Sequence, residues 1–215
     1  NMKAFLVEQI ADKEFISGVK EVSIPKCGDN EVVIEVTYSS LNYKDALSSI
    51  GNPGVTRKFP HITGIDVAGT VYESTSPIFK TGEKVLVTGY DMGMNSDGGH
   101  AEYVKVPAAW VARIPDSISD KEIMTFGTAG LTAALSVNEL IENGIKPENG
   151  DILVTGATGG VGSIAIAILS KLGYNVVAIS GKKDKINFLT DADFGQLDEL
   201  LKYRGGPTFV IVKNK

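Results

Sequence analysis

The order of hydrophobic and polar positions differs between the two halves of the chain. In the first half, short apolar stretches are separated by glycine and proline, and residues 31–38 show the period-two alternation of a half-buried strand. The pattern predicts short strands at residues 3–8, 31–38, 67–72, 84–88 and 102–106. Many short strands with glycine-rich turns between them are typical of a β-barrel. The first half is therefore predicted to be a compact β-barrel domain.

A different pattern follows Pro115. An apolar, alanine-rich stretch at 124–141 is compatible with a helix, and residues 151–155 and 175–180 are apolar strand cores. Residues 163–172 are apolar nearly all round, which predicts a helix buried on more than one side. A strand, a glycine turn, a buried helix and a second strand form a βαβ unit with parallel strands. The predicted fold class is therefore α/β, with a β-barrel followed by a parallel sheet.

The parallel sheet after Gly150 is shorter than a complete dinucleotide-binding domain. Two βαβ halves need about 120–150 residues, and fewer remain after Gly150. The sequence predicts only a short helix at 194–201, with Asp193 as its N-cap, and a last strand at 208–212. The sheet is therefore expected to be incomplete, and its open edge is expected to recruit a second copy of the chain as a homo-oligomer, a dimer.

Composition narrows the class of protein. The chain has 21 Lys and Arg against 26 Asp and Glu, and a net charge of −5 at pH 7 argues against a broad nucleic-acid or anionic-membrane surface. The sequence has no run of about 18 apolar residues, so no membrane-spanning helix is expected. One cysteine, Cys27, and two histidines offer neither a disulfide framework nor a Cys/His metal site. These features are typical of a cytoplasmic protein.

The turn between the two apolar strands carries the clearest chemical signal. It holds glycines at positions 156, 159, 160 and 162, directly before the buried helix. Glycine lets the backbone approach a pyrophosphate closely, and a helix N-terminus directs free N–H groups toward an anion. We therefore expect a dinucleotide at this turn, in contact with Thr158, Gly159, Gly160 and Val161. The alternative is a tight turn from strand to helix without a ligand.

The end of the second strand indicates which dinucleotide is expected. NAD-binding enzymes usually place Asp or Glu there to accept the ribose hydroxyls. This chain has Ser180, Gly181, Lys182 and Lys183, and the first acidic residue is Asp184. A hydroxyl and two ammonium groups suit a 2′-phosphate, so NADPH is the expected cofactor. The alternative is a solvated basic loop without a ligand.

Several ordered motifs resemble the medium-chain dehydrogenase/reductase superfamily. They are VTGATGGVG (154–162), LSKLGY (169–174), SSLNYKDAL (39–47), FPHITGIDVAGTV (59–71), GHAEY (99–103) and GTAGLTA (127–133). The motifs of the first half are similar to the zinc-free, YhdH/YhfP-like branch of acryloyl-CoA reductases and quinone oxidoreductases. The resemblance covers about residues 2–183.

This resemblance implies a division of the chain. A GroES-like β-barrel catalytic domain is expected at residues 2–120, and a shortened, incomplete Rossmann-type NADPH-binding portion at 121–207. Residues 208–215 are expected to form a terminal strand that returns to the catalytic domain. The zinc enzymes of the superfamily have a cysteine where this chain has Asn42, so no metal is expected.

The resemblance also implies roles for three residues. Tyr43 is expected to border the nicotinamide and the substrate, although a packed tyrosine at the barrel edge would look the same. Asn42 is an amide donor for a ribose or a carbonyl, or a turn cap. Thr128 is expected to contact the cofactor, with helix packing as its alternative.

Other polar residues are expected to be structural. Asp45 is predicted to cap a helix that starts near Lys44. His61 and His100 are predicted to be structural or surface residues, and residues 92–98 to be a mobile loop.

The function implied is reduction of an activated C=C bond of an enoyl-CoA (acryloyl-CoA-like), or of a quinone, by NADPH without zinc. Tyr43 or water would complete the protonation of the product. Two alternatives stay open: a truncated, catalytically incompetent nucleotide-binding homologue, and a binding module on the same scaffold.

Overall fold

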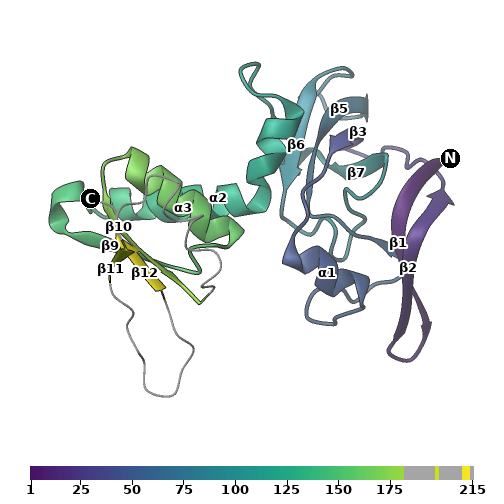
Figure 1. Cartoon of the computed structure of the whole chain (residues 1–215). Helices are drawn as coiled ribbons and strands as arrows, with labels where there is room; N and C mark the ends of the chain where they lie inside the picture. The colour runs from purple at the N-terminus through teal and green to yellow at the C-terminus, as the bar shows by residue number, and fades with distance from the viewer. Residues whose placement is uncertain (182–196, 199–209, 214–215) are drawn as a thin grey trace. The chain divides into compact units, whose positions relative to one another are not determined.

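The computed structural model describes residues 1–181, 197–198 and 210–213 (Figure 1). The chain divides into two compact units, Asn1–Thr128 and Ala129–Lys215, and each is described by itself. No helix in the described ranges is long and apolar enough to cross a membrane.

Antiparallel strands build the first unit, as the alternating pattern predicts. One sheet has the order β2-β1-β4 and the other the order β7-β3-β5-β6-β8. The strands are β1 (Met2–Ala11), β2 (Glu14–Val22), β3 (Glu31–Tyr38), β4 (His61–Ile62), β5 (Asp66–Ser74), β6 (Lys84–Thr88), β7 (Tyr103–Pro107) and β8 (Ala112–Arg113). Helix α1 (Tyr43–Ser49) follows β3, and a 3-10 turn, η1, spans Ala108–Trp110. The core of the larger sheet is aliphatic, with Ile34 and Val67 fully buried among its members.

The hairpin of β1 and β2, purple in Figure 1, was only half predicted. Its second strand is missing from the sequence prediction, because the turn carries neither glycine nor proline. Lys13 takes the positive φ of 58° that the turn requires, a conformation uncommon for a residue with a side chain.

The second unit contains the predicted βαβ arrangement. Strands β9 (Asp151–Thr155) and β10 (Asn175–Ser180) are parallel, and α3 (Gly160–Lys171) packs against both (Figure 1). Ile166 and Leu169 of α3 are buried in one cluster with Val176 of β10, which explains why this helix is apolar on more than one side. A 3-10 turn, η2 (Pro147–Asn149), precedes β9.

Helix α2 (Asp120–Glu142) begins in the first unit and continues in the second. It is longer than the predicted 124–141 and is interrupted at Gly127, whose φ of 48° and ψ of −149° are not helical. The sequence pattern gave no sign of this kink, because an isolated glycine within an apolar helix is usually tolerated.

The C-terminal elements differ from the prediction. Strand β12 (Val210–Lys213) pairs antiparallel with β10, and β11 (Leu197–Asp198) pairs with β12, so the order is β11-β12-β10-β9. The helix predicted at 194–201 is wrong at Leu197 and Asp198, whose backbone pairs with a strand, and its other residues lie outside the described ranges. Residues 208–215 were expected to return to the first unit. Their described part instead pairs with β10, whose free edge offers backbone partners.

Candidate functional site

The first group of predicted site residues lies where α1 begins. Asp45 accepts the backbone N–H of Asn42 (2.7 Å) and that of Ile65 (3.2 Å). Asn42 is thus the N-cap of α1, the alternative that the sequence left open for it, and Asp45, the third residue of the helix, completes a capping box with it. Tyr43 is the first residue of α1, and its side chain is 80% exposed. The alternative, a tyrosine packed at the barrel edge, is thus wrong in this structure, and the phenol of Tyr43 is accessible.

A buried carboxylate joins Asn42 to Thr128. Asp66, at the start of β5, is 0% exposed. Its Oδ2 accepts from Asn42 Nδ2 (2.8 Å) and from the Thr128 backbone N–H (3.0 Å), and its Oδ1 accepts from Thr128 Oγ1 (2.6 Å). We call Asn42, Asp66 and Thr128 the Asp66 cluster. Two residues that were singled out separately in the sequence therefore share one partner, and that partner had no predicted role.

The glycine turn, Gly156–Gly162, connects β9 to α3. Gly156 has a positive φ of 60°, and its carbonyl accepts the N–H of Gly159 at 2.8 Å. A Cβ on Gly162 would lie 2.4 Å from the Gly156 oxygen, so the closing residue of the turn must lack a side chain. The first N–H groups of α3, which starts at Gly160, have no partner within the helix and point out of its N-terminus. A turn of this geometry at a helix N-terminus is suited to bind an anion.

The tip of β10 contacts the glycine turn. Thr158 Oγ1 lies 3.1 Å from Ser180 Oγ, and the Ala157 N–H donates to the carbonyl of Ile179 (3.1 Å). Ser180 is 4% exposed, whereas Gly181 is exposed. The structure thus brings Thr158 and Ser180 together. Lys182 and Lys183 lie outside the described residues.

A hollow of about 520 Å³ lies beside the glycine turn. It is lined by β9, the turn and side chains of α2 and α3, and most of its lining is apolar: Val137, Leu140, Ile152, Leu153, Val154, Val161, Ala165 and Leu169. This surface and the N-terminus of α3 give one place in the second unit an apolar wall and N–H donors, a combination typical of ligand sites.

His61 is structural, as predicted. It is 2% exposed, and its Nε2 lies 3.0 Å from the carbonyl oxygen of Gly93, which requires a proton on Nε2. Burial lowers the pKa of His61. The loop at residues 92–98, which contains Gly93, is also held at both of its ends. Met92 is fully buried, and the Gly98 N–H donates to the Ile62 carbonyl. The expected mobile loop at 92–98 is therefore a packed one.

This burial predicts a pH dependence of stability. Because the pKa of His61 is lower in the folded chain than in the unfolded chain, the unfolded chain binds the proton first as the pH falls through about 6.5. The free energy of unfolding of the first unit should therefore decrease between about pH 7.5 and 5.5, and less so in His61→Gln. Urea titrations at several pH values, followed by the fluorescence of the single tryptophan, Trp110, measure this. Gly18→Ala, at a position with open space around it, is the control and should keep the wild-type slope. An unchanged slope in His61→Gln would contradict the prediction.

Two further features lie apart from these groups. Burial raises the pKa of the Cys27 thiol, and its Sγ lies 3.5 Å from the Glu31 carbonyl oxygen, which fits an unreactive thiol. Within the described ranges, no three His, Cys, Asp or Glu side chains are grouped so that they could hold a metal ion.

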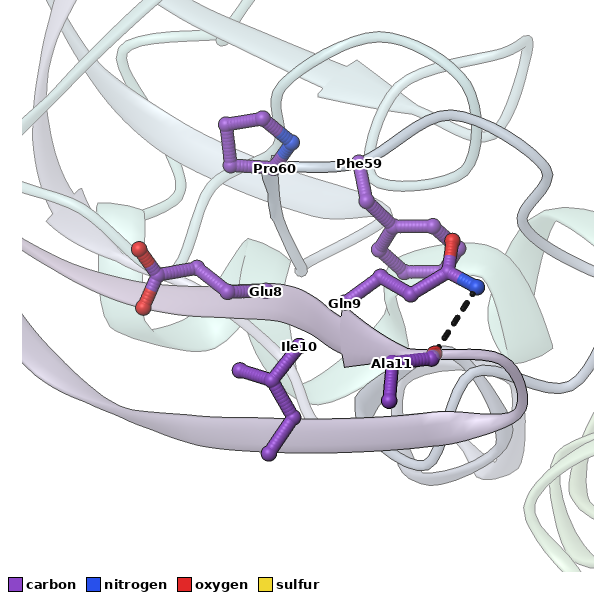
Figure 2. Close-up of a pocket in the computed structure, with 6 residues that line it drawn as sticks. All are labelled: Glu8, Gln9, Ile10, Ala11, Phe59 and Pro60. Carbon is purple, nitrogen blue, oxygen red and sulfur yellow. Dashed lines mark hydrogen bonds between the residues drawn. The ribbon is translucent and has the colours of Figure 1, made fainter.

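Another hollow, of about 460 Å³, lies between the β1–β2 hairpin and the Phe59-Pro60 segment (Figure 2). The Gln9 amide donates to the carbonyl of Ala11 at 3.2 Å, the bond drawn as a dashed line in Figure 2. None of the predicted site residues lines this hollow.

Known proteins resemble this chain over most of its length. Residues 28–116 match the Alcohol dehydrogenase GroES-like domain, which confirms the GroES-like fold predicted for the first half. YhfP of Bacillus subtilis (strain 168), whose name places it with the quinone oxidoreductases, is 46% identical over 187 residues, which are 87% of this chain and 56% of YhfP. The acrylyl-CoA reductase AcuI of Ruegeria pomeroyi is 41% identical over 193 residues, 87% of this chain and 58% of AcuI.

Solved structures agree with these matches. The yhdH oxidoreductase of Salmonella enterica, in complex with NADP, superposes with a TM-score of 0.84 at 43% identity, over 89% of this chain and 59% of that one. Bacillus subtilis yhfP with NAD bound gives a TM-score of 0.83 at 44% identity, over 89% and 58%. The chain thus spans little more than half the length of these relatives.

Proposed function

The chain belongs to the medium-chain dehydrogenase/reductase family, among its YhdH- and YhfP-like oxidoreductases. On this premise we propose that it acts as a zinc-free reductase that uses NADPH. The proposed substrate is the activated C=C bond of an acryloyl-CoA-like thioester, or a quinone. The observation that carries the proposal is the glycine turn Gly156–Gly162 at the N-terminus of α3.

The residues of the turn fit a dinucleotide. The position of Gly162 leaves no room for a Cβ, and Gly156 holds the positive φ that the tight turn needs. The backbone N–H groups of Gly160 and Val161, in the first turn of α3, would bind the pyrophosphate, and Thr158 would flank it. When bound, the dinucleotide supplies a hydride for the reduction.

The first unit supplies polar groups for the substrate and the nicotinamide in this proposal. Without a metal ion, the substrate carbonyl must be polarised by O–H or N–H donors. The exposed hydroxyl of Tyr43 is suited to donate to that carbonyl or to protonate the reduced carbon. Asn42 and Thr128 are proposed to contact the nicotinamide half of the cofactor.

The preference for NADPH is the finer part of the proposal. One relative of known structure carries NADP and another carries NAD, so the family alone does not decide the cofactor. The sequence Ser180-Gly181-Lys182-Lys183, without an acidic residue at the strand tip, supports the 2′-phosphate.

Calorimetric titration of the 215-residue chain with NADPH and NADH tests the proposal. NADPH should bind more tightly than NADH. The Lys182→Ala/Lys183→Ala variant should lose about tenfold in NADPH affinity, because each of the two exposed charge pairs contributes on the order of 0.5–1 kcal/mol, and should bind NADH unchanged. Lys171→Ala, an exposed lysine at the far end of α3, is the matched control.

The outcomes separate the alternatives. Binding together with NADPH oxidation by a quinone or an enoyl-CoA supports the reductase. Binding without turnover indicates the incompetent nucleotide-binding homologue instead. If neither dinucleotide binds, the reductase proposal fails for this chain.

Self-association belongs to the same proposal. Strand β9 is the end strand of the described four-stranded sheet, and Leu153 on it is 58% exposed. An open edge with an apolar side chain supports a homo-oligomer.

A further inference from the structure

Asp66 is unusual because an aspartate side chain is rarely buried completely in a folded protein. Its side chain is fully buried at the start of β5, where an ionised carboxylate needs hydrogen-bond donors to replace water. In the part of the chain that the structure describes, three neutral groups donate to it: the Asn42 amide, the Thr128 N–H and the Thr128 hydroxyl. These partners lie 24 and 62 residues away along the chain, so the carboxylate connects the start of α1 to the kink of α2.

The carboxylate determines how Asn42 is oriented. A carboxylate accepts hydrogen bonds from the Asn42 amide, so the NH₂ group of Asn42 faces Asp66. The side-chain oxygen of Asn42 then serves the Asp45 backbone N–H in the capping box that begins α1. The backbone of Asn42 is held separately, because its N–H donates to Asp45 at 2.7 Å. Both the main chain and the side chain of Asn42 are thus fixed by carboxylates before any ligand arrives.

The same argument applies to Thr128. Its backbone N–H and its hydroxyl both donate to Asp66, one to each carboxylate oxygen. The residue before it, Gly127, leaves room for this arrangement, since a Cβ there would lie 2.6 Å from Asp66 Oδ2. The hydroxyl proton of Thr128 is therefore directed at Asp66.

We propose that Asp66 is a positioning residue for the reaction: through Asn42 it fixes the start of α1, and with it Tyr43, and it locks Thr128 beside the kink. This inference rests on the proposed function and adds a residue to it. Asp66 touches neither cofactor nor substrate in this scheme and acts through Asn42 and Thr128. Preorganised groups bind more tightly because their orientation is settled before binding.

Asp66→Asn tests the proposal, because it keeps the shape and removes one acceptor. The remaining oxygen can still accept from Asn42 and from the Thr128 N–H, and the Thr128 hydroxyl must turn to accept from the new NH₂ group, but all these bonds lose the carboxylate charge and become weaker. NADPH affinity of the full chain is expected to fall about tenfold. In a chain that already carries Asn42→Ala, the same substitution should cost at least threefold less, because one of the positioned groups is gone. Asp97→Asn is the matched control: Asp97 also accepts a backbone N–H within the first unit (Ile62, 3.1 Å), and its removal should leave the affinity within about twofold.

A second readout does not depend on the cofactor. In NMR hydrogen-exchange measurements, the Asn42 side-chain proton bonded to Asp66 should exchange slowly in the wild type and rapidly in Asp66→Asn. If the wild type binds no dinucleotide, the proposed function fails, while loss of this protection still supports the positioning of Asn42. If Asp66→Asn does not fold, Thr128→Ser and Thr128→Val replace it. Only the serine, which keeps the hydroxyl donor, should retain wild-type protection of Asn42.

Two results would overturn the proposal. A lower unfolding midpoint in Asp66→Asn, with unchanged NADPH affinity and unchanged exchange at Asn42, would make Asp66 an ordinary buried polar residue. Equal effects of Asp66→Asn in the wild-type and Asn42→Ala backgrounds would also remove Asn42 from the scheme.

Discussion

Gly162→Ala is expected to destabilise the second unit by up to about 2 kcal/mol and to weaken dinucleotide binding at least tenfold. An alanine within a helix normally gains about 1 kcal/mol over glycine. Here the new Cβ would lie 2.4 Å from the Gly156 oxygen, 2.8 Å from the Gly156 carbonyl carbon and 3.0 Å from Ala157 Cα. These are backbone atoms that cannot rotate away, and overpacking of this kind costs about 1–3 kcal/mol, which outweighs the helical gain.

The affinity is expected to change more than the stability because relief of the clash must move the turn itself. Urea unfolding followed by far-UV circular dichroism and calorimetric titration with NADPH measure the two effects. Gly181→Ala, which has no atom within 4 Å of the new Cβ and no positive φ, is the stability control and should unfold like the wild type. A Gly162→Ala variant more stable than the wild type would contradict the steric argument.

The glycine turn and the strands beside it could be predicted from the sequence for a physical reason. Residues 151–155 and 175–180 are strand cores next to an apolar helix, and a βαβ unit with a short glycine turn buries all three together. The contact between Thr158 and Ser180 follows from the same geometry, because parallel strands place their carboxyl ends at one edge of the sheet.

The Asp66 cluster could not be predicted in the same way. Local periodicity carries no information on a carboxylate that bonds to residues 24 and 62 positions away. Asp66 stood within a motif of the family resemblance, but the sequence analysis assigned it no role, and it is fully buried. An aspartate in an otherwise apolar strand start (ITGIDVAG) is the one signal that could have pointed to it, because buried carboxylates need partners.

The C-terminal prediction failed through competition between local and tertiary preferences. Residues 194–201 have a helical sequence pattern, yet the backbone of Leu197 and Asp198 pairs with β12. Pairing with a strand edge depends on a partner distant in sequence, which a local pattern does not reveal.

Gly127→Ala is expected to destabilise the first unit by roughly 2–6 kcal/mol, the largest effect predicted for a single methyl group in this chain. The φ of 48° with ψ of −149° lies close to a region that is essentially restricted to glycine, and strain of this kind costs about 1–3 kcal/mol. The new Cβ would also lie 2.6 Å from Asp66 Oδ2 and 2.8 Å from Ser40 Oγ, which adds an overpacking cost of similar size. Denaturant unfolding followed by Trp110 fluorescence reports on this unit, and Gly18→Ala, with open space around its Cβ, should stay within about 0.5 kcal/mol of the wild type.

The two costs at Gly127 can be separated in an Asp66→Ala background. That substitution removes the nearest clashing atoms and leaves the backbone conformation to be strained, so the cost of Gly127→Ala should decrease by about 1 kcal/mol or more. An equal cost in both backgrounds would assign the effect to φ and ψ alone and would separate Gly127 from the cluster. A cost below about 1 kcal/mol in the wild-type background would show that the kink itself can relax. In that case the position of Thr128 beside Asp66 would not depend on glycine, and the kink would be a consequence of the Asp66 hydrogen bonds rather than a condition for them.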